Sequence, residues 1–514
     1  MIMVNESKNN IFTSAFTVSI VAIIFKVVAF LKQAVVAYYF GATLETDIYF
    51  IANGFVYGVG EAIVKSISMV ILSVYITAKI RDGRDTSSML MGSLLLLLLP
   101  VVIFLSFAFY ILAPDLSLMI APSYDAYRSG ILSDFIRILS FLFIFIFIEP
   151  IGASILDAEG SYYIPRVNSL ILSVFTILGC ILFASRMGVR ALVVSQYLAS
   201  GLFVLILMIS TRNYISFKNA RFRDNHYLKT IAKLAFPLFI GNLAIQLNQI
   251  IDKAIASKFD DGAVSALSYS HVLEQLVTSV FIVNVGNIMF AHFSELSAGD
   301  EHDKLSLRIT RTLNLMLIVL VPISIITFFQ ARNITAIVYF RGQFNLDALT
   351  KTSLLLAVYA IEFPAVAMRD ILMKGMYALG ETRLPVIGGV ISIIINILSS
   401  IYLAKLIGIL GIAIGTVISI YFGAVFNIYY FRKKMHVKPR FKLVFITALK
   451  CIPASLLSIV LILCVQVIGL PKSPVISFLM VSVITFILFG LVLFVLKVEE
   501  LHMLKNMITK KFKL

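Results

Sequence analysis

Charged side chains lie inside two long apolar runs near the start of the chain. Lys26 and Lys32 belong to the first run, and Asp47, Glu61 and Lys65 belong to the second. An ionisable group in membrane hydrocarbon costs several kcal/mol unless it faces a cavity or a partner, so each of these residues is a candidate for function. Lysine ammonium groups act as point charges for phosphate, so the pattern favours an anionic ligand.

Helical spacing tests whether these side chains can share one cavity. Lys26 and Lys32 are about 120° apart around a helix, and Asp47, Glu61 and Lys65 fall within about 40° of one stripe. The alternatives stay open. The two lysines of the first run could extend to a membrane interface, and Glu61 and Lys65 could form a structural i,i+4 ion pair.

Further candidates lie in later apolar runs. Asn248 and Asp252 form a candidate cation site, and His271 and Glu274 are expected to join the substrate cavity. His271 could titrate near neutral pH or be a hydrogen-bonded core histidine.

A third group lies in a single apolar run: Glu362, Arg369, Asp370 and Lys374. Asp370 and Lys374 have i,i+4 spacing, and the group lies toward one end of its run. We predict that it forms a gate or a structural network.

Motifs for chemistry do not occur. There is no phosphate-binding glycine loop, metal-ligand spacing or nucleophile elbow, so we expect a carrier and not an enzyme, without cofactor or metal. The membrane potential, worth about 2.3 kcal/mol per charge per 100 mV, or a monovalent ion could drive it.

The composition excludes a soluble globule. The 514 residues are 60% hydrophobic and 14% charged, whereas soluble domains are about 45–50% apolar and about 25% charged. The net charge of +16 is explained by loops that contact anionic lipids, and nucleic acid is not an expected partner.

The apolar runs predict an all-α polytopic membrane protein with about fourteen spans. They are Ile11–Phe40, Asp47–Ala78, Ser88–Leu112, Ile131–Leu156, Tyr162–Phe183, Val189–Thr211, Thr230–Ser257, Ala263–Phe293, Leu305–Phe329, Thr352–Met376, Leu384–Ala404, Ile407–Phe431, Phe441–Val467 and Pro474–Leu496. Basic loops predict that both termini are cytoplasmic.

An internal repeat organises these spans. Gly160 and Pro165 recur as Gly380 and Pro385, and Gly41 recurs as Gly262 at nearly the same offset. The predicted divisions are a six-helix lobe, a basic cytoplasmic linker, a second six-helix lobe, and two further helices with a basic cytoplasmic tail. They cover residues 1–212, 213–229, 230–431 and 432–514.

Three motifs resemble the MurJ/MviN family of lipid II flippases, within the multidrug/oligosaccharidyl-lipid/polysaccharide exporter superfamily. They are FGATLETDIYFIA at 40–52, YFRGQF at 339–344 and MYALGETRLP at 376–385. The resemblance covers nearly the whole chain. It implies a bacterial inner-membrane protein that moves lipid-linked peptidoglycan precursor to the outer leaflet by alternating access. The polyprenyl-diphosphate-linked glycan and membrane lipids would be its partners, and glycan-synthesis enzymes could be recruited by its basic loops.

The chain departs from the family pattern in its charges. Two arginines of the family's first span fall on Lys26 and Lys32, and the arginine of the eighth span falls on Val272. The basic and acidic residues of the second span are exchanged at Glu61 and Lys65. A Wzx-type flippase for O-antigen, capsule or exopolysaccharide units is therefore an alternative, followed by a drug antiporter and a non-transporting scaffold.

Overall fold

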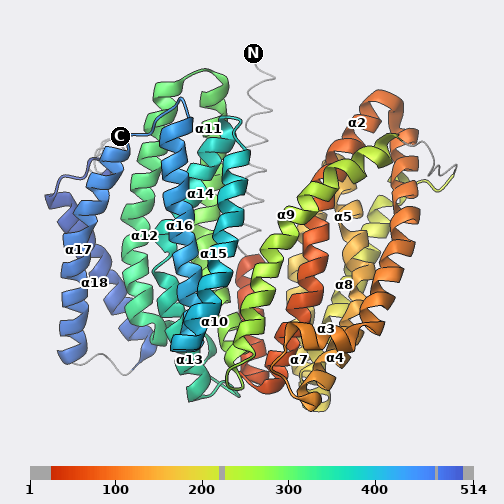
Figure 1. Ribbon diagram of the computed structural model, residues 1–514, viewed down its shortest axis with the longest axis horizontal. Helices are drawn as coiled ribbons and strands as arrows, with labels where there is room; N and C mark the ends of the chain where they lie inside the picture. The colour runs from red at the N-terminus through yellow and green to blue at the C-terminus, as the bar shows by residue number, and fades with distance from the viewer. Residues whose placement is uncertain (1–24, 219–225, 469–472, 502–514) are drawn as a thin grey trace, which may run out of the picture. The chain divides into compact units, whose positions relative to one another are not determined.

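The computed structural model describes residues 25–218, 226–468 and 473–501, and every regular element within them is a helix (Figure 1). This confirms the all-α class. The chain forms two compact units. The first comprises Met1–Ser265 with Gly342–Phe344, and the second comprises Ala266–Arg341 with Asn345–Leu514. The lobe boundary at 213–229 stays a prediction, and residues 11–24 of the first predicted span lie outside the described ranges.

The first unit begins its described part with a helix at residues 25–40. Its further helices are α2 (Leu44–Ile111), α3 (Ala113–Ile120), α4 (Ala126–Ser140), α5 (Leu142–Ala158), α6 (Tyr163–Arg166), α7 (Asn168–Met187), α8 (Arg190–Thr211), a 3₁₀ turn at Arg212–Tyr214, and α9 (His226–Ala256). Helix α10 (Ala263–Val277) begins in this unit and continues into the second.

The segment α2 comprises two helices that meet at Gly83, whose φ of 90° and ψ of 173° are not helical. The two predicted spans of this region are therefore separate helices with almost no loop between them. Polar side chains next to the junction bond back to the backbone. Thr86 donates to the carbonyl of Asp82 at 3.0 Å, and Ser87 donates to that of Arg84 at 2.8 Å.

Two other predicted spans are each interrupted near the middle of the apolar run. Residues 131–156 divide at Phe141 between α4 and α5, and residues 352–376 divide between α13 (Leu346–Ala360) and α14 (Phe363–Ala378). Carbonyl groups freed at a break need new donors within a bilayer. The hydroxyl of Tyr197 donates to the carbonyl of Ile138, and that of Tyr421 donates to the carbonyl of Ile361 at 3.0 Å.

The second unit continues from α10 through a π-helical turn at Thr278–Val283. Its remaining helices are α11 (Asn284–Ala298), α12 (His302–Tyr339), α13, α14, α15 (Arg383–Ile407), α16 (Leu410–Lys434), α17 (Phe441–Ile468) and α18 (Pro474–Val495). Helices α17 and α18 pack side by side and against α12 (Figure 1).

Backbone conformation supports the sequence repeat. Gly160 and Gly380 both have positive φ, 82° and 79°, where each chain leaves a helix. The two helix breaks are also about 220 residues apart. Helices α4, α5, α7 and α8 therefore correspond to α13, α14, α15 and α16.

Apolar packing and lipid-compatible surfaces complete each unit. Ile71, Tyr75 and Ile155 form part of the core between α2 and α5, and Phe363 and Phe431 belong to that of the second unit. Eleven helices in the described ranges are long and apolar enough to cross a membrane, with α2 counted once. The chain is thus a polytopic helical membrane protein.

Candidate functional site

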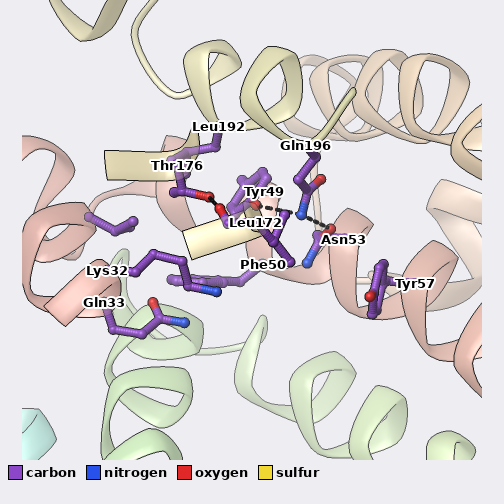
Figure 2. A pocket seen from close by; sticks show the side chains of 11 residues that line it. Lys32, Gln33, Tyr49, Phe50, Asn53, Tyr57, Leu172, Thr176, Leu192 and Gln196 are labelled. Atoms are coloured by element: carbon purple, nitrogen blue, oxygen red, sulfur yellow. Dashed lines mark hydrogen bonds between the residues drawn. The ribbon is translucent and has the colours of Figure 1, made fainter. Parts of the chain in front are cut away.

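A cavity of about 160 Å³ lies inside the first unit, among the helix at 25–40, α2, α7 and α8 (Figure 2). Its lining residues are Lys32, Gln33, Val36, Tyr49, Phe50, Asn53, Tyr57, Leu172, Thr176, Leu192 and Gln196. Tyr49, Asn53 and Tyr57 are four residues apart, so helical periodicity places them on one face of α2.

The polar wall of this cavity is held by Gln196. Its Nε2 donates to Asn53 Oδ1 at 2.9 Å and lies 3.2 Å from the hydroxyl of Tyr49. Gln196 Oε1 is buried and accepts no hydrogen bond from the described residues. Lys32 enters from the opposite wall, and no carboxylate of the described chain lies within 4 Å of its amine (Figure 2). The cavity thus combines a cation with amide groups.

A second cavity of about 540 Å³ shares Tyr57 and Leu172 with the first. Lys26 lines it, together with Glu149 of α5 and Asn168 of α7. The Asn168 amide donates to Glu149 Oε1 at 2.6 Å. Within the described ranges, Lys26 likewise has no carboxylate at ion-pairing distance. The structure therefore brings both predicted lysines of the first span to adjoining cavities.

Glu61 and Lys65 form the i,i+4 ion pair that the spacing allowed. Lys65 Nζ lies 2.8 Å from Glu61 Oε1, and Gln246 Nε2 donates to Glu61 Oε2 at 3.2 Å. The Lys65 side chain is still 54% exposed. Neither residue lines the two cavities, so their substrate-binding role stays a prediction.

Asp47 has a structural position that the sequence did not reveal. One carboxylate oxygen accepts from the backbone of Gly262, and the other accepts from the backbone and hydroxyl of Ser265, at 2.5–2.7 Å. Asp47 is only 3% exposed, and its carboxylate accepts hydrogen bonds from the start of α10. It lines neither cavity, so its predicted role in substrate binding stays a prediction.

Lys253 of α9 was absent from the predicted site. Its amine donates to the carbonyl of Phe50 at 3.1 Å and lies against Gly54 of α2. A Cβ atom at Gly54 would lie 2.3 Å from that amine. Only the glycines of α2, at positions 54, 58 and 60, could have indicated this close approach.

The candidate cation site of α9 is only partly defined. Asn248 Oδ1 is buried and accepts no hydrogen bond from the described part of the chain. Asp252 lies one turn further along the same helix. Their ion-binding role stays a prediction.

The candidates of the second unit form separate contacts. His271 Nδ1 lies 3.2 Å from Glu274 Oε2, and Lys374 Nζ lies 2.8 Å from Asp370 Oδ2. Glu362 stands at the break before α14 and interacts electrostatically with Glu274 and Arg369. These contacts are compatible with the predicted network of α14, and the placement of His271 and Glu274 in a substrate cavity stays a prediction.

Crossing helices, charged cavities within a helical unit and a duplicated architecture define the class of membrane transporters built from repeats. Residues 36–490 match the family model described as lipid II flippase MurJ, so the chain belongs to this family.

Curated relatives agree over most of the chain. A probable lipid II flippase MurJ of Thermotoga maritima is 25% identical over 406 residues, covering 78% of this chain and 81% of the relative. One of Aquifex aeolicus is 24% identical over 404 residues, covering 76% and 77%.

Solved structures share the fold. A lipid II flippase MurJ in an inward closed conformation superposes with a TM-score of 0.79 at 20% identity, covering 92% of this chain and 97% of the other. An inward-facing multidrug resistance MATE family transporter of the MOP superfamily has a TM-score of 0.69 at 12% identity, covering 80% and 94%.

Proposed function

We propose that this protein is a lipid II flippase of the bacterial cytoplasmic membrane, which moves the lipid-linked peptidoglycan precursor from the inner to the outer leaflet. The observation that carries the proposal is the pair of adjoining cavities lined by Lys26 and Lys32, whose amines have no carboxylate at ion-pairing distance among the residues that the structure describes. A diphosphate supplies the negative charge that such cations need in a low-dielectric site.

The polar groups around the lysines suit the rest of a glycan headgroup. Asn53, Gln196 and Asn168 offer amides that can exchange hydrogen bonds with sugar hydroxyls. Lys65, being largely exposed, can attract the diphosphate before it reaches Lys32. Apolar helix surfaces would contact the polyprenyl chain.

Transport would proceed by alternating access, with both termini cytoplasmic, and would be coupled to the membrane potential or a monovalent ion. Membrane lipids surround the protein, and enzymes of envelope glycan synthesis are proposed partners of its basic loops. The curated relatives described above carry the name lipid II flippase, which supports lipid II over an O-antigen or capsule intermediate.

Complementation tests the proposal. A bacterium depleted of its own lipid II flippase should regain growth, and lipid II should become accessible on its outer face. The double variant Lys26→Ala/Lys32→Ala should fail at equal expression, while Lys433→Ala, a change at the exposed end of α16, should rescue growth. A correctly inserted protein that leaves lipid II inaccessible would contradict the proposal and favour a different lipid-linked glycan.

A further inference from the structure

Glu362 occupies an unusual position at the break between α13 and α14. It is 3% exposed, and its side chain does not cap α14. Glu362 Oε2 is buried and accepts no hydrogen bond from any described residue. Ionisation of this carboxylate is costly, because a buried oxygen without a hydrogen-bond donor loses the stabilisation that bulk water gives a charge.

The groups around Glu362 do not neutralise it. Glu274 of α10 is 5% exposed and repels it, while Arg369, two turns along α14, attracts it. Arg369 makes no ion pair within 4 Å in the described ranges. Glu274 is already associated with His271, and Asp370 with Lys374.

Tyrosines are the remaining titratable groups near the break. Tyr421 of α16 donates to the carbonyl of Ile361, and Tyr359 of α13 lies with its ring centre 6.1 Å from that of His271. Both are neutral at ordinary pH. Two carboxylates and one guanidinium, all ionised, therefore give Glu362, Glu274 and Arg369 together one net negative charge.

The repeat supplies independent support for a ligand site here. Glu274 and Arg369 lie 221 and 220 residues after Asn53 and Glu149, which line the two cavities of the first unit. Two of the three residues of the cluster thus occupy backbone positions that line a cavity in the other copy of the fold.

We propose that Glu362, with Glu274 and Arg369, forms a proton-binding site that couples proton movement to flipping. A hydronium ion transfers a proton to a carboxylate oxygen of Glu362: an O–H bond of hydronium breaks, an O–H bond forms at the carboxylate, and a neutral water molecule is left. The added proton makes the cluster neutral, and its loss restores the negative charge. Because Glu362 lies at a helix break, the charge change acts where α13 and α14 can reorient. The coupling rests on the proposed flippase function, whereas proton binding does not.

Infrared spectroscopy of the purified protein tests proton binding without any substrate. The wild type should show the carbonyl stretch of a protonated carboxylic acid at neutral pH, and Glu362→Gln should remove that band. Glu274→Gln should move its titration to lower pH, because a repelling charge is lost. The control Glu295→Gln changes a carboxylate that is 79% exposed and should leave the band unchanged. A band that survives Glu362→Gln in a folded, monodisperse variant would overturn the proposal.

Flipping assays in proteoliposomes then distinguish a failure of the proposed proton site from a failure of the proposed flippase function. A pH gradient should accelerate lipid II flipping by the wild type and by Glu295→Gln, but not by Glu362→Gln. Absence of wild-type flipping with the expected infrared band would reject the flippase function and retain the proton site. Flipping that responds to sodium replacement but not to pH would overturn the proton assignment.

Discussion

In the first unit Asn53 faces a cavity beside Lys32, whereas the position 221 residues later holds Glu274, buried against His271. Glu149 lines the larger cavity, and its counterpart in the second unit is Arg369. Gln196 and Thr176 line the smaller cavity, while their counterparts Thr416 and Asn396 bond to each other at 3.0 Å.

The two units share backbone features but differ in the charges of their side chains. The helix breaks and positive-φ glycines recur in both units, but the charges at matching positions do not. A cavity with unpaired lysines suits an anionic ligand, and a buried cluster with excess carboxylate suits a cation. Duplication thus gives one fold two kinds of site.

The largest expected effect concerns the unpaired lysine. Lys32→Ala should lower the flipping rate about tenfold to a hundredfold, since a charge-assisted hydrogen bond contributes about 1.5–3 kcal/mol. Lys32→Arg keeps the charge and should retain most activity. Initial rates in proteoliposomes measure both. Equal rates for wild type and Lys32→Ala would show that the cavity lined by Lys32 does not bind the anionic part of the substrate.

The contact of Lys253 with Gly54 can be broken by one methyl group. Gly54→Ala should lower the free energy of unfolding by about 1 kcal/mol, because the new Cβ would displace the end of the Lys253 side chain and break its hydrogen bond to the carbonyl of Phe50. The matched control Gly241→Ala adds a methyl group to α9 where nothing lies within 4 Å, and it should be neutral or slightly stabilising. Thermal unfolding in detergent compares the two. Similar melting temperatures would contradict the close approach.

Asp47 distinguishes a structural carboxylate from a ligand-binding one. Asp47→Ala should cost about 1–2 kcal/mol of stability, because three hydrogen bonds to the start of α10 are lost. Asp47→Asn should cost less, since one acceptor remains. Melting temperature and substrate affinity should be measured together. A stable Asp47→Ala variant with reduced substrate affinity would show that Asp47 belongs to the substrate site.

The smallest effect is a pH dependence at the end of α5. Burial acts to raise the pKa of Glu159, but hydrogen bonds from Lys79 and Tyr75 outweigh it and hold the pKa below its ordinary value. The resulting stability is present above the ordinary carboxyl pKa and is lost as pH falls through the lowered value. Melting temperatures at several acidic pH values should therefore converge for wild type and Glu159→Gln. A constant difference between them would reject this linkage.

Some features follow from the sequence because they depend on local pattern. Long apolar runs require helices in a bilayer, since each backbone polar group must be satisfied within its own segment. Glycine and proline at a fixed offset revealed the repeat, and spacing alone predicted the Glu61–Lys65 and Asp370–Lys374 pairs. The two lysines of the first span were identified because a charged side chain in membrane hydrocarbon costs free energy.

Tertiary structure decided the rest. The breaks at Phe141 and Ile361 lie inside apolar runs, and they are stabilised by tyrosine hydroxyls from α8 and α16. Asp47 was a candidate for the same cavity as the charged residues of the first two runs, but it accepts hydrogen bonds from residues more than 200 positions away. A sequence shows that a charge is buried, but only packing of distant helices decides which partner it meets, because Coulomb energy and hydrogen bonding depend on distances that the chain's order does not contain.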